Sequence, residues 1–418
     1  MFLEKRIHRN MILNKKIFLT LFCITFGVFL YAQGNIKSIQ LKTSKPTNFS
    51  TIVPLGQVLQ LSFDDLQADQ KEYSYKIEHM NADWTPSNIP SNIYIIGFNQ
   101  NRILRYENSF NTFQNYTHYS VQIPNSNTQI TKSGNYLISV LNEYEEVIFT
   151  RKFTYYESNA LVGVSVIRSS NTSQGNQQQT VQFTINYNGN EIRNPSQEIE
   201  TVVIQNNNWK TAIYDLKPQF YRNNQLVYKY FNKPNFWSGN EYLNFDNKQI
   251  RNSTIQIARV EKKDIYHSYL YPQQARKDRP YTYFPDINGH FIIRTIEANK
   301  AQTEADYAMV HFSLDSRLIN NKEIYVYGAF NDFSLTTENK MKFNTNNSRH
   351  ETAILLKQGF YNYTFVTKDK SGIVNPIEIN GSFDETENEY SVVVYYQAFG
   401  ENYQRVLGLG TGFINVRQ

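Results

Sequence analysis

Histidines are the residues of this sequence best suited to acid–base catalysis or metal binding. Beyond residue 32 the chain has six, and none of them forms an H-E-x-x-H pair or another short metal-ligand spacing. The sequence also lacks a G-x-S-x-G elbow, a phosphate-binding loop and a dinucleotide fingerprint. We therefore predict a protein that is not an enzyme and holds no cofactor and no metal. His79 and His118 could meet across strands, but we expect hydrogen-bonded structural roles for them. The six histidines are His79, His118, His267, His290, His311 and His350.

Two groups of carboxylates could in principle bind calcium or act as an acid–base pair. Asp64 and Asp65 are adjacent in a strand-like segment, so their side chains should point to opposite faces of the sheet. The acidic residues within 384–389 alternate with polar residues in a turn-rich stretch. We expect a solvated loop there rather than an ion site.

The three tryptophans could supply exposed aromatic platforms, which stack on sugars or peptides. For Trp209 we expect a core position. Trp84 and Trp237 lie in polar, turn-rich surroundings, and either contact with a partner or a local anchoring role fits them.

The first 32 residues resemble a secretory signal peptide, whether translation starts at Met1 or at Met11. Lys15 and Lys16 precede an apolar run over residues 17–30, which is shorter than the roughly 20 residues of a membrane-spanning helix. The run ends before Ala32, where we expect cleavage; a lipoprotein anchored through Cys23 is the less favoured alternative. Cleavage would remove the only cysteine and lower the formal net charge from +5 to +1. The mature chain would then be exported, would have no disulfide, and would carry no charge excess that favours nucleic acid.

The remaining sequence predicts an all-β protein. Its 31 tyrosines and 28 phenylalanines favour pleated, half-buried surfaces. Apolar and polar residues alternate with a period of two, for example over residues 181–187, and no long amphipathic helix pattern occurs. We predict three tandem immunoglobulin-like or early-set β-sandwiches after a signal peptide at 1–32. The predicted ranges are 33–157, 158–270 and 300–418, with an aromatic and proline-containing connector at 271–299.

A dense block of aromatic and amide residues lies within the first predicted sandwich. It comprises Tyr75–Trp84, Gly97–Asn99, Ser109–Thr112 and Tyr116–Tyr119. Such a mixture suits a surface that binds another macromolecule better than a site that performs chemistry. Our candidate partner-binding residues are Trp84, Phe98, Arg102, Tyr106 and Trp237. The alternative is that the block pins a long loop onto its own sheet.

This signature block resembles that of the type IX secretion system plug proteins of Bacteroidota. Residues 236–246 (FWSGNEYLNFD) resemble the middle segment of that family, although Leu243-Asn244 stand where a basic residue is usual. The resemblance implies a periplasmic protein, associated with the outer membrane through a large translocon β-barrel whose pore it seals between cargoes. It also implies a chain that is monomeric by itself.

The last predicted sandwich has a likeness of its own. Residues 324–333, 341–343 and 359–363 resemble the early-set sandwich of glycogen- and starch-binding modules. Phe333 stands where the sugar-stacking tryptophan of such modules would be, which makes it a candidate glycan-facing residue. The alternative function is therefore a periplasmic or surface glycan-binding protein.

Overall fold

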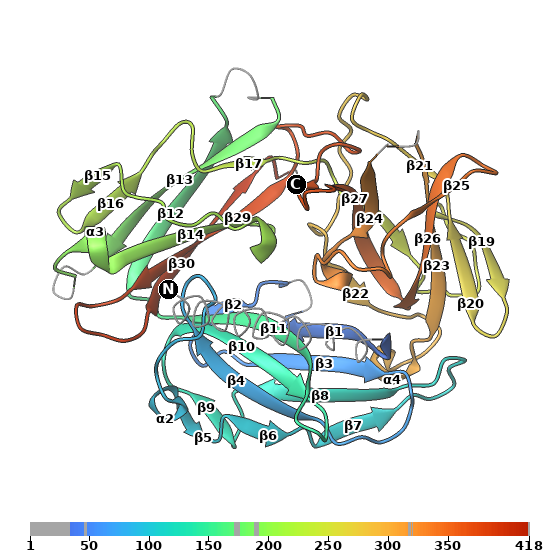
Figure 1. The fold of residues 1–418 in the computed structure, drawn as a ribbon, viewed down its shortest axis with the longest axis horizontal. Helices are drawn as coiled ribbons and strands as arrows, with labels where there is room; N and C mark the ends of the chain where they lie inside the picture. Colours follow the sequence, from blue (N-terminus) through green and yellow to red (C-terminus); the bar gives the residue numbers. More distant parts are fainter. Residues whose placement is uncertain are drawn as a thin grey trace, which may run out of the picture.

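The strands of this chain pair into several antiparallel sheets, and the prediction of an all-β fold is confirmed. The structure, a computed structural model, describes residues 34–45, 48–170, 176–187, 192–316, 319 and 321–416. The predicted signal peptide lies outside these residues. Figure 1 shows three groups of strands arranged around a common centre, which we call the first, middle and third sandwiches.

The first sandwich consists of two main sheets. One sheet has the order β1-β3-β8-β7, and the other has the order β2-β11-β10-β4-β6. Alternation in β4, whose tyrosine and isoleucine side chains point inward, explains why this segment forms a half-buried strand. A short two-stranded sheet, β5-β9, follows the single-turn helix α2. The strands are β1 (Ile36–Lys42), β2 (Ile52–Pro54), β3 (Leu59–Asp65), β4 (Ser74–Met80), β5 (Ile95–Gly97), β6 (Gln100–Arg102), β7 (Arg105–Asn108), β8 (Thr117–Ile123), β9 (Thr128–Ile130), β10 (Gly134–Leu141) and β11 (Val147–Tyr156), and α2 is Ser91–Tyr94.

The middle sandwich is completed by the end of the chain, which corrects the predicted division. Its first sheet has the order β12-β13-β16-β15, with β17 also paired to β13. Its second sheet has the order β14-β29-β30, although we had predicted residues 388–414 in the third sandwich. The elements are β12 (Ala160–Arg168), β13 (Gln178–Tyr187), α3 (Pro195–Glu198), β14 (Ile199–Gln205), η3 (Trp209–Thr211), β15 (Phe220–Arg222), β16 (Gln225–Tyr228), β17 (Asn235–Trp237), β29 (Asn388–Tyr396) and β30 (Arg405–Ile414).

Glycines in β30 explain why this strand fits against β12. A Cβ atom on Gly410 would lie 2.6 Å from Val162 Cγ1, and one on Gly412 would lie 2.6 Å from Val164 Cγ1. Alternate residues of a strand share a face, so the repeated glycines form a flat strip along β30 that receives the valines of β12. This complementarity between distant segments explains why the end of the chain packs in the middle sandwich.

The third sandwich takes in the segments on both sides of residue 270. Strands β18 to β20 come from the predicted middle unit, and β21 and β22 come from the predicted connector, so both of those boundaries are corrected as well. One sheet contains β18, β22, β24, β27 and β28, and the other has the order β19-β20-β23-β26-β25 with β21 beside β23. The elements are β18 (Leu243–Asp246), β19 (Ile257–Lys262), β20 (Tyr266–Leu270), β21 (Gln273–Gln274), β22 (Phe291–Ile293), α4 (Ala301–Glu304), β23 (Tyr307–Asp315), β24 (Lys322–Tyr327), η4 (Ala329–Asn331), β25 (Lys342–Asn344), β26 (Arg349–Lys357), β27 (Gly359–Asp369) and β28 (Val374–Asn375).

A shared hydrophobic cluster joins the first and middle sandwiches. It includes Ile52 and Ala82 of the first sandwich together with Val202, Val393 and Tyr395 of the middle one. Burying this apolar surface stabilises the contact by removing it from water. Among the described residues, no helix has the length and apolar character needed to cross a membrane.

Candidate functional site

Histidine 79 of the signature block has a structural role in the core of the first sandwich. Its Nδ1 lies 2.9 Å from Ser87 Oγ, and its ring packs edge-on against Tyr136 at 5.1 Å. Burial lowers the pKa of His79 to about 4, with a hydrogen bond to the Ser133 backbone opposing, so the ring is neutral at pH 7. A side chain on Gly134 would collide with this imidazole.

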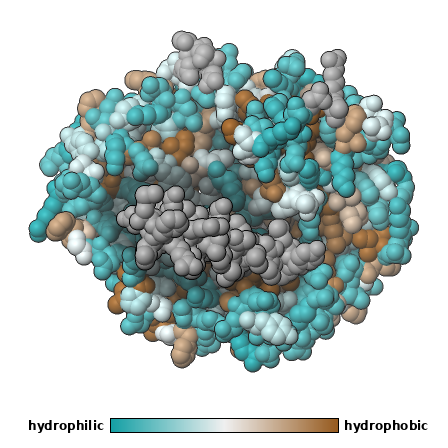
Figure 2. All heavy atoms as spheres, in the orientation of Figure 1, coloured by the Kyte–Doolittle hydropathy of each residue, from teal (hydrophilic) through white to brown (hydrophobic). Residues whose placement is uncertain are grey.

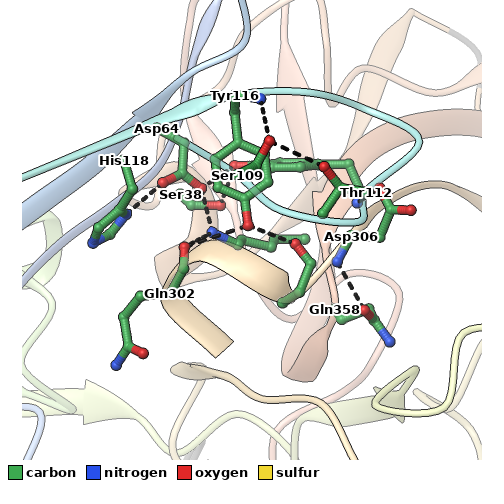
Figure 3. Close-up of polar contacts among 12 residues, drawn as sticks. Ser38, Asp64, Ser109, Thr112, Tyr116, His118, Gln302, Asp306 and Gln358 are labelled. Carbon is green, nitrogen blue, oxygen red and sulfur yellow. Dashed lines mark hydrogen bonds and ion pairs between the residues drawn. The ribbon is translucent and has the colours of Figure 1, made fainter. Parts of the chain in front are cut away.

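Histidine 118 belongs to a buried polar network between the first and third sandwiches (Figure 3). Its Nδ1 lies 2.6 Å from Asp64 Oδ1. The other oxygen of Asp64 accepts hydrogen bonds from Lys357 Nζ at 2.6 Å and from Tyr307 OH at 2.7 Å. Tyr307 OH also lies 2.7 Å from Ser38 Oγ. His79 and His118 therefore lie in opposite sheets with separate partners.

The buried Asp64–Lys357 ion pair fixes β3 of the first sandwich to β26 of the third. Burial alone would raise the pKa of Asp64, but Lys357 and His118 together hold that pKa below its usual value. Burial lowers the pKa of Lys357, and Asp64 opposes the shift. The neighbouring Asp65 points the other way, towards Lys71 Nζ at 2.7 Å and Tyr73 OH at 2.9 Å. The two adjacent carboxylates thus serve separate structural contacts, as their alternation in a strand predicts.

The second half of the signature block docks onto the third sandwich. The backbone N–H of Phe110 donates to Thr303 O at 2.9 Å, and that of Phe113 donates to Asp306 Oδ2 at 2.8 Å. Tyr116 OH donates to the carbonyl of Ala305 at 2.8 Å. Within this loop, Ser109 Oγ accepts from Thr112 Oγ1 and from the Tyr116 backbone, both at 3.0 Å (Figure 3). These residues pin a loop, as the alternative interpretation of the block proposes, but onto another sandwich rather than onto their own sheet.

Tryptophan 84 lies at the joint between the first and middle sandwiches. It adopts a φ of 67°, and its half-buried ring packs edge-on against Trp209 at 4.8 Å. Lys152 Nζ lies 4.4 Å from the centre of the same ring. Both tryptophans thus contact other parts of the same chain, and Trp209 lies against the cluster between the sandwiches rather than inside one core.

Tryptophan 237 and Phe333 line one cavity of about 710 Å³ between the middle and third sandwiches. Phe333 is only 7% exposed and packs against Tyr327 at 5.2 Å. Its ring is therefore not an exposed surface of the kind that the likeness to glycogen-binding modules implies. Two of the amides that line the cavity bond to each other: Asn206 Nδ2 donates to Asn388 Oδ1 at 2.7 Å.

A buried carboxyl group, Asp286, lies at the edge of this cavity, and no sequence pattern predicted it. Asp286 accepts backbone hydrogen bonds from Tyr242 at 2.5 Å and from Asn288 at 2.7 Å. Burial raises the pKa of Asp286 to about 7, and the carboxylates of Glu241 and Glu387 add to the rise. Neither strand periodicity nor any motif marks such a group, because its burial depends on how two sandwiches meet.

The acidic stretch 384–389 is less solvated than predicted. Only Glu385 is exposed. Asp384 Oδ2 lies 3.1 Å from Arg168 Nε, and Asn388 Nδ2 donates to Gln179 Oε1 at 3.0 Å. The stretch leads into β29, which the middle sandwich buries, so its residues face protein on most sides. Among the described residues, no cluster of three or more histidine or acidic groups could hold a metal ion.

Exposed apolar residues concentrate at the outer edge of the first sandwich. Five of the 22 exposed large apolar side chains among the described residues lie within residues 93–106, and Phe98 and Leu104 are 71% and 75% exposed. Large apolar patches on a protein surface often mark binding sites. We call the surface formed by Ile93, Ile96, Phe98, Leu104 and Tyr106 the rim surface.

The rim surface lies where both sheets of the first sandwich end. Figure 1 places α2, β5, β6 and β7 on the side away from the other two sandwiches, and Figure 2 shows apolar side chains at that edge. Strands β6 and β7 are the edge strands of their sheets. Short, exposed edges of this kind can accept a partner by backbone or side-chain contact.

Two arginines flank the apolar part of the rim surface. Arg102 and Arg105 line a shallow cavity of about 230 Å³ together with Leu104 and residues 125–127. The backbone N–H of Phe98 donates to Asn127 O at 2.9 Å, and Asn127 is one of the residues that line this cavity. Arg102 forms an exposed ion pair with Glu72.

Part of this surface was predictable from the sequence. Phe98, Arg102 and Tyr106 are among the predicted partner-binding residues, whereas Ile93, Ile96 and Leu104 are not. Isoleucine and leucine are ordinary core residues, so the only available signal was their position in a turn-rich stretch without clear alternation. The structure brings Phe98 and Arg102 together, whereas Trp84 and Trp237 lie at separate joints within the molecule.

The fold and these surfaces define an all-β protein of packed sandwiches with an exposed apolar edge. Comparison with known families then places it: the domain described as "Type 9 secretion system plug protein 1st domain" matches residues 36–157, the range of the first sandwich. The chain belongs to the type IX secretion system plug family. This is not a family of enzymes, and it implies a secretion-related location in the cell envelope.

One solved structure shares the fold over most of the chain. The crystal structure of a hypothetical protein from Parabacteroides merdae matches with 31% identity and a TM-score of 0.87, covering 91% of this chain and 97% of that chain. A trypsin-activated alpha-2-macroglobulin from Escherichia coli aligns with 7% identity and a TM-score of 0.18, covering 92% of this chain and 29% of that chain, and carries no argument. No curated protein matches the sequence.

Proposed function

We propose that this protein is a periplasmic plug, which binds the periplasmic mouth of the large outer-membrane translocon barrel and closes its pore when no cargo is passing. Membership of the plug family supports this proposal. The observation that carries it for this chain is the rim surface, an exposed apolar edge on the very domain that defines the family. In this proposal the residues before the first sandwich are the signal peptide that directs export.

The contacts between the sandwiches suit a protein that must close a pore. A wide aqueous pore leaks unless the protein that closes it is rigid. The Asp64–Lys357 ion pair joins the first sandwich to the third, and an apolar cluster joins the first to the middle. Such contacts hold the sandwiches together as one body, which a stopper requires.

The rim surface has the make-up of a protein-binding interface. Binding energy at interfaces is concentrated in a few aromatic, arginine and apolar side chains that become buried. Phe98 and Leu104 are the most exposed side chains of the rim surface, and Arg102 and Arg105 lie beside them. We infer that Phe98 and Leu104 enter the barrel mouth and that the arginines surround them. Tyr106 belongs to the same surface but is less exposed, at 37%. Trp84 and Trp237 are candidates of lower rank, because both contact other parts of their own chain.

Co-purification from detergent-solubilised outer membranes tests this proposal. The tagged wild type should bring down a large barrel, and the double variant Phe98→Asp and Leu104→Asp should lose it. The matched control is Phe399→Asp, because Phe399 is likewise an exposed phenylalanine but lies in the turn between β29 and β30. A barrel absent from every wild-type preparation would refute the proposal.

Closure of the pore needs a separate readout. Deleting the gene should make the outer membrane more permeable to large polar dyes when no cargo fills the barrel. The same deletion complemented with the rim variant should stay permeable, and complementation with Phe399→Asp should restore the barrier. Unchanged dye uptake in the deletion strain would show that the protein does not seal the pore.

A further inference from the structure

A second cavity, of about 390 Å³, lies where all three sandwiches meet. The first sandwich contributes Lys42, Arg151 and Lys152, and the middle sandwich contributes Lys210. The third contributes His290 and the strand that follows it, β22. Figure 1 shows β1, β11 and β22 converging at the centre of the molecule. A cavity of this size can hold a small organic ligand.

The charges around this cavity are unbalanced. Among the described lining residues four are cationic, Lys42, Arg151, Lys152 and Lys210, and only Asp332 is acidic. Arg151 Nη1 lies 4.0 Å from Asp332 Oδ2, the outer limit of an ion pair. Burial lowers the pKa of Lys152 and the charge of Lys210 lowers it further, with Asp332 opposing. Burial also lowers the pKa values of Lys42 and Arg151. An anion in the cavity would relieve this excess of positive charge.

Two residues that line the cavity, His290 and Asn207, each have a buried acceptor without a donor. Phe49 stacks on the His290 ring at 4.5 Å, and burial lowers the pKa of His290 to about 4, with the Asn206 backbone opposing. The imidazole is therefore neutral at pH 7. Its buried Nε2 and the buried Oδ1 of Asn207 find no hydrogen-bond partner within the described part of the chain. Leaving such atoms unpaired is costly, and a hydroxyl group would satisfy either of them.

We propose that this cavity binds a small phosphate ester that also carries hydroxyl groups, such as a sugar phosphate. The phosphate accepts hydrogen bonds from Arg151 and the lysines, and the hydroxyls donate to His290 Nε2 and Asn207 Oδ1. Arginine and lysine are the side chains that bind phosphate most strongly. Because the ligand would touch all three sandwiches, its binding would stabilise their mutual arrangement.

Isothermal titration calorimetry on the purified chain without residues 1–32 tests this assignment. The probes are inorganic phosphate, glucose 6-phosphate and glucose, compared at one ionic strength because screening weakens charge contacts. Glucose 6-phosphate should bind more tightly than phosphate, and glucose should not bind. Absence of binding by both phosphate compounds, or binding by glucose alone, would overturn the proposal.

Two variants locate the site. Lys210→Gln changes an exposed side chain, so this variant should fold normally. Arg151→Gln changes a more buried cation, whose side chain is 18% exposed. Each should weaken glucose 6-phosphate binding about tenfold or more, because each removes a charge-assisted hydrogen bond. The control is Lys342→Gln, an exposed lysine on β25 outside the cavity, which should bind as the wild type does. Affinity that is unchanged in Lys210→Gln and in Arg151→Gln would place the bound ligand elsewhere and refute the assignment.

Discussion

Replacing Lys357 by methionine should destabilise the protein strongly, because it leaves the carboxylate of Asp64 buried without its main counter-charge. The side chains of Lys357 and Asp64 are 2% and 1% exposed, and the two groups lie 2.6 Å apart. Removing one partner of a buried ion pair costs about 3–5 kcal/mol. Lys357 also donates to Gln302 O at 2.7 Å, and its ammonium lies 3.9 Å from the centre of the Tyr116 ring. We therefore expect a loss of about 4 kcal/mol in the free energy of unfolding.

A second ion pair between the same two sandwiches supplies the matched control. Lys37 of β1 lies 2.7 Å from Glu338, whose side chain is 55% exposed. Exposed pairs contribute about 0–1 kcal/mol, so Lys37→Met should cost at most about 1 kcal/mol. Urea unfolding followed by tryptophan fluorescence measures both variants against the wild type.

The double variant separates a true pair from two independent losses. Adding Asp64→Asn to Lys357→Met removes the uncompensated charge, so the double variant should be more stable than the sum of the two single losses predicts. A Lys357→Met protein within about 1 kcal/mol of the wild type would refute the argument that this pair fixes the first sandwich to the third.

Two further predictions concern stability. The folded pKa of Asp286, about 7, lies above the ordinary 3.8, so the folded chain binds this proton more tightly than the unfolded chain does. Stability should therefore fall as the pH rises from about 4 to about 7. Melting temperatures across that range should show the decline in the wild type and a smaller one in Asp286→Asn; an equal decline in both would contradict this cause. Gly410→Ala should cost about 1–3 kcal/mol in urea unfolding, because the added methyl would press on Val162. The control Thr411→Ala, at an exposed position of the same strand, should be nearly neutral.

Local patterns predicted the strands well and their partners poorly. The alternation in residues 181–187, for example, corresponds to β13. No local pattern showed that β14 pairs with β29, nearly 200 residues further along the chain, from Ile199 opposite Tyr396 to Gln205 opposite Tyr390. That pairing depends on how whole faces fit, as the glycines of β30 fit the valines of β12.

The same limit applies to the candidate site. The signature block predicts a binding surface, but its residues serve three purposes: His79 fills a core, Tyr116 joins the first sandwich to the third, and Phe98 faces solvent. Aromatic residues in turn-rich sequence look alike whether another part of the same chain or an outside partner covers them. Only the arrangement of the sandwiches distinguishes Trp84, which Trp209 covers, from Phe98, which stays exposed.

Photo-crosslinking in living cells tests the central claim most directly. A photoreactive phenylalanine analogue placed at position 98 should form an adduct with the translocon barrel, identified by mass spectrometry. The same analogue at position 399, which is even more exposed and does not belong to the rim surface, should not. An adduct from position 98 alone is the predicted result. No adduct at position 98, with the protein present and folded, would contradict the proposal that the rim surface closes the pore.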